Sequence, residues 1–301
     1  MCAHEVCQGK TAFRSADEQR TSFFKMCDGL TRIVIVGKQI ATIRITLKCF
    51  LIESSKQLVL IDFQTKGSRK FPKETDPGIN IGCAIITMYH GHGYRELTEL
   101  ATQVGKRFLF ESAVMDGAPI FSLFRQPLAG AKLLGFTGIL NSCTNLLLER
   151  MEAGETLNEA IAYGTSIGIT ETDPSNDVDG WDASIKIAAL ATVLMNHPMT
   201  PLEVDRTGIR GITPEMIAAA KAAGERWKLI CTGEFRDGVF IAEVKPRRVG
   251  PDSPFYTVSG TSSFVTFRLD VLPGLGVLES DPGPETTAFG LLSDLIYACG
   301  D

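Results

Sequence analysis

Apolar residues in the first half of the chain form short strand-like runs separated by polar stretches and by one helical pattern. Strands are predicted in "TRIVIVGKQIATIRI", whose β-branched run ends at Gly37, and in "QLVLIDF", "CAIITM" and "KRFLFESAV". Between the last two, "YRELTELATQVG" has the apolar spacing of an amphipathic helix. Residues 65–80, rich in Gly, Pro and Lys, predict a loop. Strands that alternate with a helix in this way favour a parallel α/β sheet.

Helical patterns dominate the second half of the chain. "GILNSCTNLLLERMEAG" predicts a strand end and a helix that stops at Gly154, and "TLNEAIAYGTSIG" predicts a second helix capped by Thr156. In "ITPEMIAAAKAAGERWKLI", Thr213 as N-cap and Pro214 at the first helical position mark another helix start. "GVFIAEVKPRRV" and "SFVTFRLDVL" predict strands of a second sheet, and "TTAFGLLSDLIYA" predicts a closing helix.

Composition narrows the class of protein. With 301 residues, 44% hydrophobic and 22% charged, the chain is long enough for one large or two ordinary globular domains. A net charge of −5 without basic runs argues against a nucleic-acid partner, and no apolar run is long enough to span a membrane. The eight cysteines are scattered without Cys-x-x-Cys spacing, which favours a reduced intracellular protein without structural zinc. Residues 1–30 lack a signal core, so an irregular leader and a cytoplasmic location are expected.

One predicted helix, "WDASIKIAALATVLM", combines an almost wholly apolar body with two charges at its start. Asp182 and Lys186 are four residues apart, so they share a helical face in the order that favours an ion pair. An exposed pair on the first turn is one interpretation, worth about 0.3 to 0.5 kcal/mol. The other is a lysine with a tuned pKa that faces a cavity and serves as general acid and base.

Several motifs in a fixed order resemble the catalytic domain of homoserine dehydrogenase. They are "FLFESAVMDGAPI" (108–120), "GILNSCTN" (138–145) and "GITETDPSNDVDGWDASIK" (168–186), followed by "IRGITPEMI", "KLI" and "DPGPETTAFGLLSDL". The resemblance covers roughly residues 94–298. It implies an enzyme that interconverts homoserine and aspartate semialdehyde by hydride transfer to or from NAD or NADP, in aspartate-derived amino-acid biosynthesis.

The resemblance also implies roles for individual residues. The lysine that handles the hydroxyl proton corresponds to Lys186, and the acids that hold the amino end of the substrate correspond to Glu171 and Asp182. Asp177 in the same loop is expected to assist them. A carboxylate set beside a lysine suits this chemistry, because a cationic amine needs carboxylates and an alcohol needs a base as the hydride leaves.

A monovalent cation, sodium or potassium, is also implied by the resemblance, in the loop "ESAVMDGA". Its ligands would be Glu111 and the backbone oxygens of Val114, Asp116 and Ala118, since carbonyl and carboxylate oxygens suit a hard cation. The alternative is structural: Glu111 ends a strand, and residues 117–119 form a turn.

The cofactor half departs from the family pattern. A dinucleotide-binding turn has the sequence G-x-G-x-x-G, whereas "VIVGKQIATI" has Gly37 alone. Asp62 lies where an acid would hold a ribose hydroxyl, although it also fits an ordinary strand end. His90 stands in the place of a family lysine that lies at the cofactor and substrate. Gly283 and Thr287 match the closing turn that meets the cofactor in the family.

These features predict an α/β protein with a shortened Rossmann-type domain, residues 31–122 plus 284–301, and an inserted substrate domain, residues 123–283, with helices on a mixed sheet. Family members pair through that sheet, so a homodimer is expected, with a monomer as the alternative. The leading hypothesis is an NAD(P)-dependent homoserine dehydrogenase. One alternative is a catalytically inactive relative that has lost nucleotide binding and serves as a binding or regulatory module. Another is an oxidoreductase acting on a different hydroxy acid.

Overall fold

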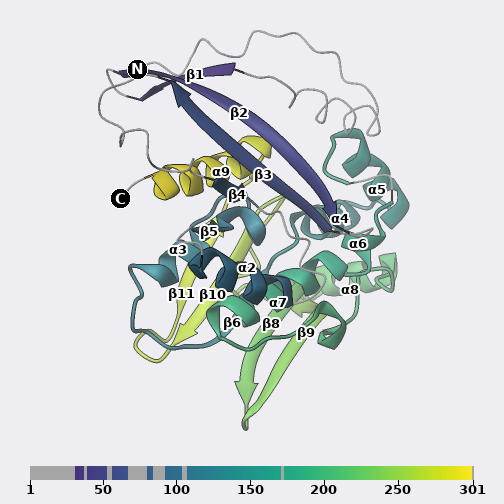
Figure 1. The fold of residues 1–301 in the computed structure, drawn as a ribbon. Coiled ribbons are helices and arrows are strands. Elements are labelled where there is room, and N and C mark those ends of the chain that lie inside the picture. Colours follow the sequence, from purple (N-terminus) through teal and green to yellow (C-terminus); the bar gives the residue numbers. More distant parts are fainter. Residues whose placement is uncertain are drawn as a thin grey trace.

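The computed structural model describes residues 31–36, 39–52, 56–66, 80–83, 92–103, 107–170 and 173–299. Their strands form two sheets (Figure 1). The first sheet, in the order β1-β2-β3-β4-β5, contains β1 (Thr31–Val36), β2 (Gln39–Ile52), β3 (Lys56–Lys66), β4 (Asn80–Cys83) and β5 (Phe108–Leu109). The second, in the order β11-β10-β6-β8-β9-β7, contains β6 (Leu133–Ile139), β7 (Asp205–Arg206), β8 (Arg226–Arg236), β9 (Val239–Val249), β10 (Ser263–Leu269) and β11 (Leu275–Glu279).

The parallel arrangement predicted for the front strands is wrong. β1 pairs antiparallel with β2, β2 with β3 and β3 with β4, and only the short β4–β5 pair is parallel. The reason is chain length: two residues separate β1 from β2 and three separate β2 from β3. A parallel crossover needs a dozen or more residues, whereas an antiparallel hairpin needs only two. The long β2–β3 hairpin in Figure 1 is the result.

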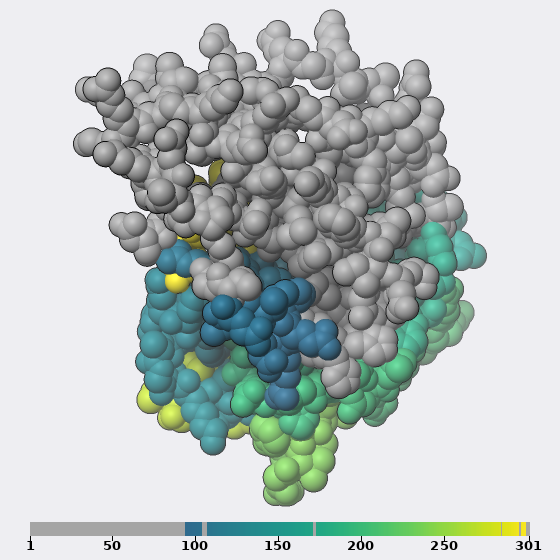
Figure 2. Space-filling view, viewed as in Figure 1, coloured from purple at the N-terminus to yellow at the C-terminus, as the bar shows by residue number. Residues whose placement is uncertain are grey.

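The second sheet is mixed, as predicted. All of its neighbouring strands are antiparallel except β7, which runs parallel to β9 at one edge. Its β8–β9 hairpin closes through Asp237 and Gly238, both with positive φ, as a two-residue hairpin turn requires. The tip of this hairpin projects from the body of the molecule, as the light green knob in Figure 2 shows.

The helices follow the local signals closely. They are α2 (His92–Gln103), α3 (Ile120–Arg125), α4 (Ser142–Glu152), α5 (Leu157–Ser166), α6 (Ser175–Val178), α7 (Trp181–Leu194), α8 (Pro214–Ala222) and α9 (Pro284–Cys299), with 3-10 turns η2 (Glu111–Ala113) and η3 (Pro201–Glu203). Thr156 caps α5 through a capping box, and Thr213 caps α8 with Pro214 behind it, as predicted. The strand expected in "KRFLFESAV" is shorter than predicted, because η2 begins at Glu111.

The main core joins α4 and α7 to the second sheet. Leu147 of α4, Ile187 of α7 and Phe267 of β10 are completely buried, and Phe136 of β6 is 2% exposed. α7 packs against β8 and β9, and its body is buried on nearly every side, as its apolar run predicts. No helix in the described ranges is long and apolar enough to cross a membrane. The α/β class with helices on a mixed sheet is therefore confirmed, whereas the proposed domain boundaries remain predictions.

Candidate active site

Asn141 joins the elements that carry the predicted substrate residues. It lies two residues after the end of β6 and caps α4, where its Oδ1 accepts the amide hydrogen of Thr144 at 2.7 Å. Its Nδ2 donates to Asp177 Oδ1 at 2.7 Å and to Asp182 Oδ2 at 2.8 Å. Asn141 itself is buried. One side-chain amide thus sets the position of two carboxylates that come from different elements, the end of α6 and the start of α7.

Lys186 lies beside this carboxylate pair. Its Nζ donates to the backbone oxygen of Leu140 at 2.7 Å and is 3.1 Å from Asp182 Oδ2. The lysine side chain is 21% exposed and that of Asp182 is 34% exposed, so the pair is neither closed in the core nor free on the surface. Burial lowers the pKa of Lys186, but the charge and hydrogen bond of Asp182, assisted by Asp116 and Asp177, outweigh burial and raise it. The amine is therefore held as ammonium at neutral pH.

Asp177, the second carboxylate of the pair, is half-buried. Burial raises its pKa, and the negative charge of Asp182 adds to the effect, while the hydrogen bond from Asn141 opposes it. Cys143, in the first turn of α4, contacts Thr170 Oγ1 at 3.2 Å, and burial raises the pKa of its thiol to about 12. Cys143 is accordingly an uncharged thiol beside the site and not a nucleophile. A desolvated carboxylate such as Asp177 favours a cationic partner.

The loop between α6 and α7 is anchored from outside the site. Arg210 forms an ion pair with Asp179, and its Nη2 donates to Ser175 Oγ at 3.1 Å. Gly180, with φ of 78°, precedes α7 in a left-handed conformation that favours glycine. Arg206 stacks on Trp181, with its guanidinium carbon 3.6 Å from the ring centre. Glu171, predicted to bind the substrate, lies outside the described residues.

Glu111, the acid of the predicted cation loop, forms hydrogen bonds that support the structure. Glu111 is 4% exposed, and its carboxylate oxygens accept the amide hydrogens of Phe121 at 2.6 Å and Ser122 at 2.8 Å. Glu111 therefore satisfies the first amides of α3. The backbone oxygen of Ala118 accepts the amide of Ile120 at 2.8 Å. Among the described residues, no cluster of three or more His, Cys, Asp or Glu side chains is arranged to hold a metal.

Asp116 connects the same loop to the closing helix and to the lysine. Its carboxylate accepts a hydrogen bond from Thr287 Oγ1 at 3.2 Å, and its amide donates to Glu279 Oε2 at 2.9 Å. Burial raises the pKa of Glu279, and the charge of Lys186 acts in the opposite direction. The predicted residues Asp116 and Thr287 therefore lie together, within electrostatic reach of Lys186.

The residues predicted to bind cofactor fall into two groups. Gly283 and Thr287 flank the start of α9, where Ser112 Oγ donates to the backbone oxygen of Thr287 at 3.2 Å. The turn therefore places polar groups beside Asp116, and its contact with a cofactor remains a prediction. Gly37 and His90 lie outside the described residues.

The front sheet does not fit the other end of a dinucleotide. The prediction that Asp62 ends a strand is wrong, because β3 continues to Lys66 and Asp62 pairs with Thr46 inside the sheet. β1 also leads into β2 after two residues, which leaves no room for the helix of a phosphate-binding turn.

The sequence interpretation missed Asn141, Leu140 and Glu279. Asn141 could have been found, since an asparagine between a strand and an apolar helix is a typical N-cap. Leu140 acts through its backbone oxygen and Glu279 through a bond to a distant loop, so neither has a local sequence signal.

Comparison with known proteins points to one family. Residues 119–296 match the family model described as homoserine dehydrogenase. An NAD(+)-dependent homoserine dehydrogenase from Pseudomonas canavaninivorans is 36% identical over 221 residues, which cover 72% of this chain and 62% of the relative. A homoserine dehydrogenase from Methanocaldococcus jannaschii is 38% identical over 205 residues, 68% of this chain and 60% of the relative.

A solved structure agrees with these relatives. A hyperthermophilic archaeal homoserine dehydrogenase in complex with NADPH superposes with a TM-score of 0.59 and 32% identity, covering 69% of this chain and 60% of that one. The present chain thus spans about 60% of the length of the relatives it matches.

Proposed function

Because this chain belongs to the homoserine dehydrogenase family, we propose that it interconverts L-homoserine and L-aspartate 4-semialdehyde with NAD or NADP as the hydride carrier. The reaction belongs to the biosynthesis of threonine, methionine and isoleucine. One observation carries the proposal: the Asn141 amide holds Asp177 and Asp182 together beside the Lys186 ammonium. Homoserine carries an ammonium group and a hydroxyl group, and this arrangement offers a partner for each.

The carboxylates would bind the amino end of the substrate. Asp177 is desolvated, and a substrate ammonium would supply the positive charge that favours its ionised form. Asp182 shares the Asn141 amide, so both carboxylates are fixed before the substrate arrives. Preorganisation of this kind avoids the entropy cost of gathering the groups during the reaction. Glu171 is proposed as the third acid on the strength of the family resemblance.

Lys186 would move the hydroxyl proton. The chemistry that a nicotinamide would supply when bound is hydride transfer, and the lysine would serve the substrate oxygen. When the semialdehyde is reduced, the ammonium donates a proton to that oxygen; when homoserine is oxidised, the neutral amine accepts it. Asp182 and the Leu140 oxygen hold the amine in one orientation. Because Asp182 raises the pKa of Lys186, oxidation should accelerate as the pH rises through the alkaline range.

The test follows NADH or NADPH formation from homoserine by ultraviolet absorbance. Lys186→Ala should lower kcat by about 10² to 10⁴, the usual contribution of a general acid and base. Lys221→Ala, which removes an exposed lysine of α8, should leave the rate unchanged. If the folded wild-type protein gives no turnover with either cofactor, the alternative of a binding or regulatory module replaces the proposal.

We also propose a homodimer, as the family resemblance implies. Apolar side chains are exposed on the second sheet: Phe235 is 45% exposed, Val239 61% and Leu278 57%. Sedimentation equilibrium at several concentrations should give twice the 32.7 kDa of one chain. A mass of one chain throughout would contradict the dimer. A monovalent cation bound by Glu111 and the backbone oxygens of Val114, Asp116 and Ala118, as the family resemblance implies, likewise remains a proposal. It is tested by comparing the stability of Glu111→Gln in potassium chloride and in choline chloride.

A further inference from the structure

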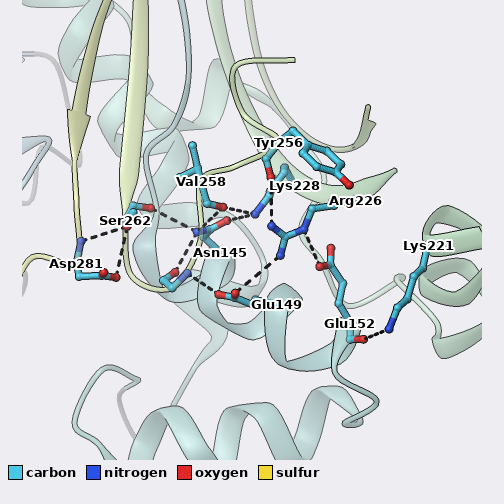
Figure 3. A network of polar contacts seen from close by, with 11 residues as sticks. Asn145, Glu149, Glu152, Lys221, Arg226, Lys228, Tyr256, Val258, Ser262 and Asp281 are labelled. Carbon is cyan, nitrogen blue, oxygen red and sulfur yellow. Dashed lines mark hydrogen bonds and ion pairs between the residues drawn. The ribbon is translucent and has the colours of Figure 1, made fainter. Parts of the chain in front are cut away.

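Lys228 is a buried cation that the proposed reaction does not use. It lies on β8 and is 1% exposed. Its Nζ donates to Asn145 Oδ1 at 2.8 Å and to the backbone oxygen of Val258 (Figure 3). In the described part of the chain, no carboxylate lies within ion-pair distance of it. A methionine could fill the same space without a charge to desolvate, so the amine has a use other than packing.

The charges around Lys228 act from a distance. Burial and, to a smaller extent, the charge of Arg226 lower its pKa from 10.5 to about 8, while Glu152 and Glu149 of α4 oppose this shift. Arg226 donates from Nε to Glu152 Oε2 at 2.8 Å and lies 3.9 Å from Glu149. Figure 3 shows this row of charges along the side of α4. The lysine itself therefore contacts only neutral oxygens, and its closest side-chain partner is Asn145.

Asn145 is held in a single orientation. An ammonium can only donate, so the oxygen of the Asn145 amide must face Lys228. The nitrogen then donates to the backbone oxygen of Gly260 at 3.0 Å. Asn145 is 1% exposed, and every polar atom of its side chain is used. Lys228 and the Gly260 backbone thus hold the Asn145 amide of α4 between them, which opposes a rotation of α4 about its own axis.

One helical turn connects the contacts of Asn145 to the proposed substrate site. Asn145 is four residues after Asn141, and its amide donates to the Asn141 backbone oxygen at 3.3 Å. Side chains four residues apart share a helical face. A rotation of α4 would therefore move the Asn141 amide away from Asp177 and Asp182, to which it donates at 2.7 and 2.8 Å.

The loop that binds Asn145 also contacts the segment before α9. The turn after Val258 contains Ser262, whose Oγ accepts the amide hydrogen of Asp281 at 3.1 Å. A Cβ on Gly260 would come within 2.7 Å of Asp281 Oδ1, so the two segments are closely packed. Asp281 lies two residues before Gly283, at the start of the turn expected to meet the cofactor.

From these contacts we propose that Lys228 is a positioning residue for the dehydrogenase reaction, acting through Asn145 to set the Asn141 amide against its two carboxylates. The inference rests on the proposed function for its kinetic consequence. Its structural content, that Lys228 controls the environment of the Asn141 side chain, does not depend on turnover.

Kinetics of matched variants test the proposal. Lys228→Met should lower kcat/KM for homoserine about tenfold or more, chiefly through KM, because the carboxylates that hold the amino end are misplaced. Ile230→Ala is the control: it removes buried apolar contact two residues further along β8 and leaves Asn145 intact. At temperatures where both variants remain folded by circular dichroism, Ile230→Ala should retain kcat/KM within about twofold. Equal losses of kcat/KM in both variants would show that Lys228 has only a structural role.

A double-mutant cycle asks whether the effect passes through Asn145. Lys228→Met and Asn145→Leu together should be no worse than the more damaging single variant, because both break the same contact. If the losses of kcat/KM in the two single variants multiply in the double variant, the effect of Lys228 does not pass through Asn145.

A measurement that needs no turnover separates the two proposals. In protein labelled with ¹⁵N-asparagine, Lys228→Met should shift the side-chain amide signals of Asn141, and Ile230→Ala should leave them in place. Unchanged Asn141 signals in Lys228→Met would overturn the inference even if the protein is an active dehydrogenase. Shifted signals in a protein without turnover would support it while the proposed function fails.

Discussion

Replacing Glu111 by glutamine separates two uses of this buried acid. Its two oxygens accept amide hydrogens from Phe121 and Ser122, and glutamine keeps only one acceptor. One charge-assisted hydrogen bond is lost and one buried amide is left without a partner, which costs about 3 kcal/mol. The substitution also removes the negative charge that repels Asp294, whose carboxylate accepts the Glu111 amide hydrogen at 2.8 Å, and this offsets part of the cost. We therefore expect a net loss of about 2 kcal/mol in the free energy of unfolding.

Urea denaturation followed by circular dichroism measures this loss, in potassium chloride and in choline chloride of equal ionic strength. Glu159→Gln is the control, since Glu159 caps α5 on the surface by accepting the Thr156 amide hydrogen, and it should lose less stability than Glu111→Gln. If Glu111 serves α3, Glu111→Gln is destabilised equally in both salts. A variant that is as stable as Glu159→Gln in choline, and differs from the wild type only in potassium, would refute the helix-capping argument and make Glu111 a cation ligand.

Three further outcomes follow from the structure. The pKa of Lys228 falls from 10.5 to about 8 on folding, so the cost of burying its charge is present in full below pH 8 and disappears above pH 10.5. As the pH rises between these values, the free energy of unfolding of the wild type, measured in urea, should increase by up to about 3 kcal/mol relative to that of Lys228→Met. Gly208→Ala should abolish or strongly reduce soluble folded protein, because its Cβ would lie 2.2 Å from the backbone oxygen of Val178. Cys143 and Cys231, whose pKa values burial raises to about 12, should resist iodoacetamide at pH 8 in the folded protein and react in urea, as site-resolved mass spectrometry would detect.

The elements best predicted from sequence are those with local signals. Thr156 and Thr213 cap helices because their hydroxyls satisfy nearby amides, and such a requirement is visible in a few residues. The buried α7 follows from an apolar run that has no polar face. In each case the sequence carries the cause within one or two helical turns.

Strand direction was predicted wrongly because a signal was overlooked. Residues 41–49 alternate strictly between apolar and polar, the period of a strand with two different faces, and only two residues separate that strand from β1. Together these features predict an antiparallel hairpin. The interpretation instead gave weight to the alternation of strands with a helix, which holds only from β4 onward.

The candidate site was predictable residue by residue but not as an arrangement. Lys186, Asp182 and Asp177 are visible in one motif, and the helix cap at Asn141 is visible in another. That the cap amide bonds to both acids depends on how α4 packs against α6 and how α6 packs against α7, which no local pattern encodes. The partners of Glu279 are 163 residues away for the same reason.

The order of strands in the second sheet also bears on how the chain folds. Thr137 in β6 lies between Thr232 of β8 and Thr266 of β10, so the first strand synthesised is an inner one, and both its neighbours emerge only after α4 to α8. Until then β6 has two bare edges, which can pair with other chains. Contacts between residues so distant in sequence also make folding slow. Nascent chains that stop before Arg226 should therefore aggregate, and chaperones that shield β6 during translation should raise the yield of native protein.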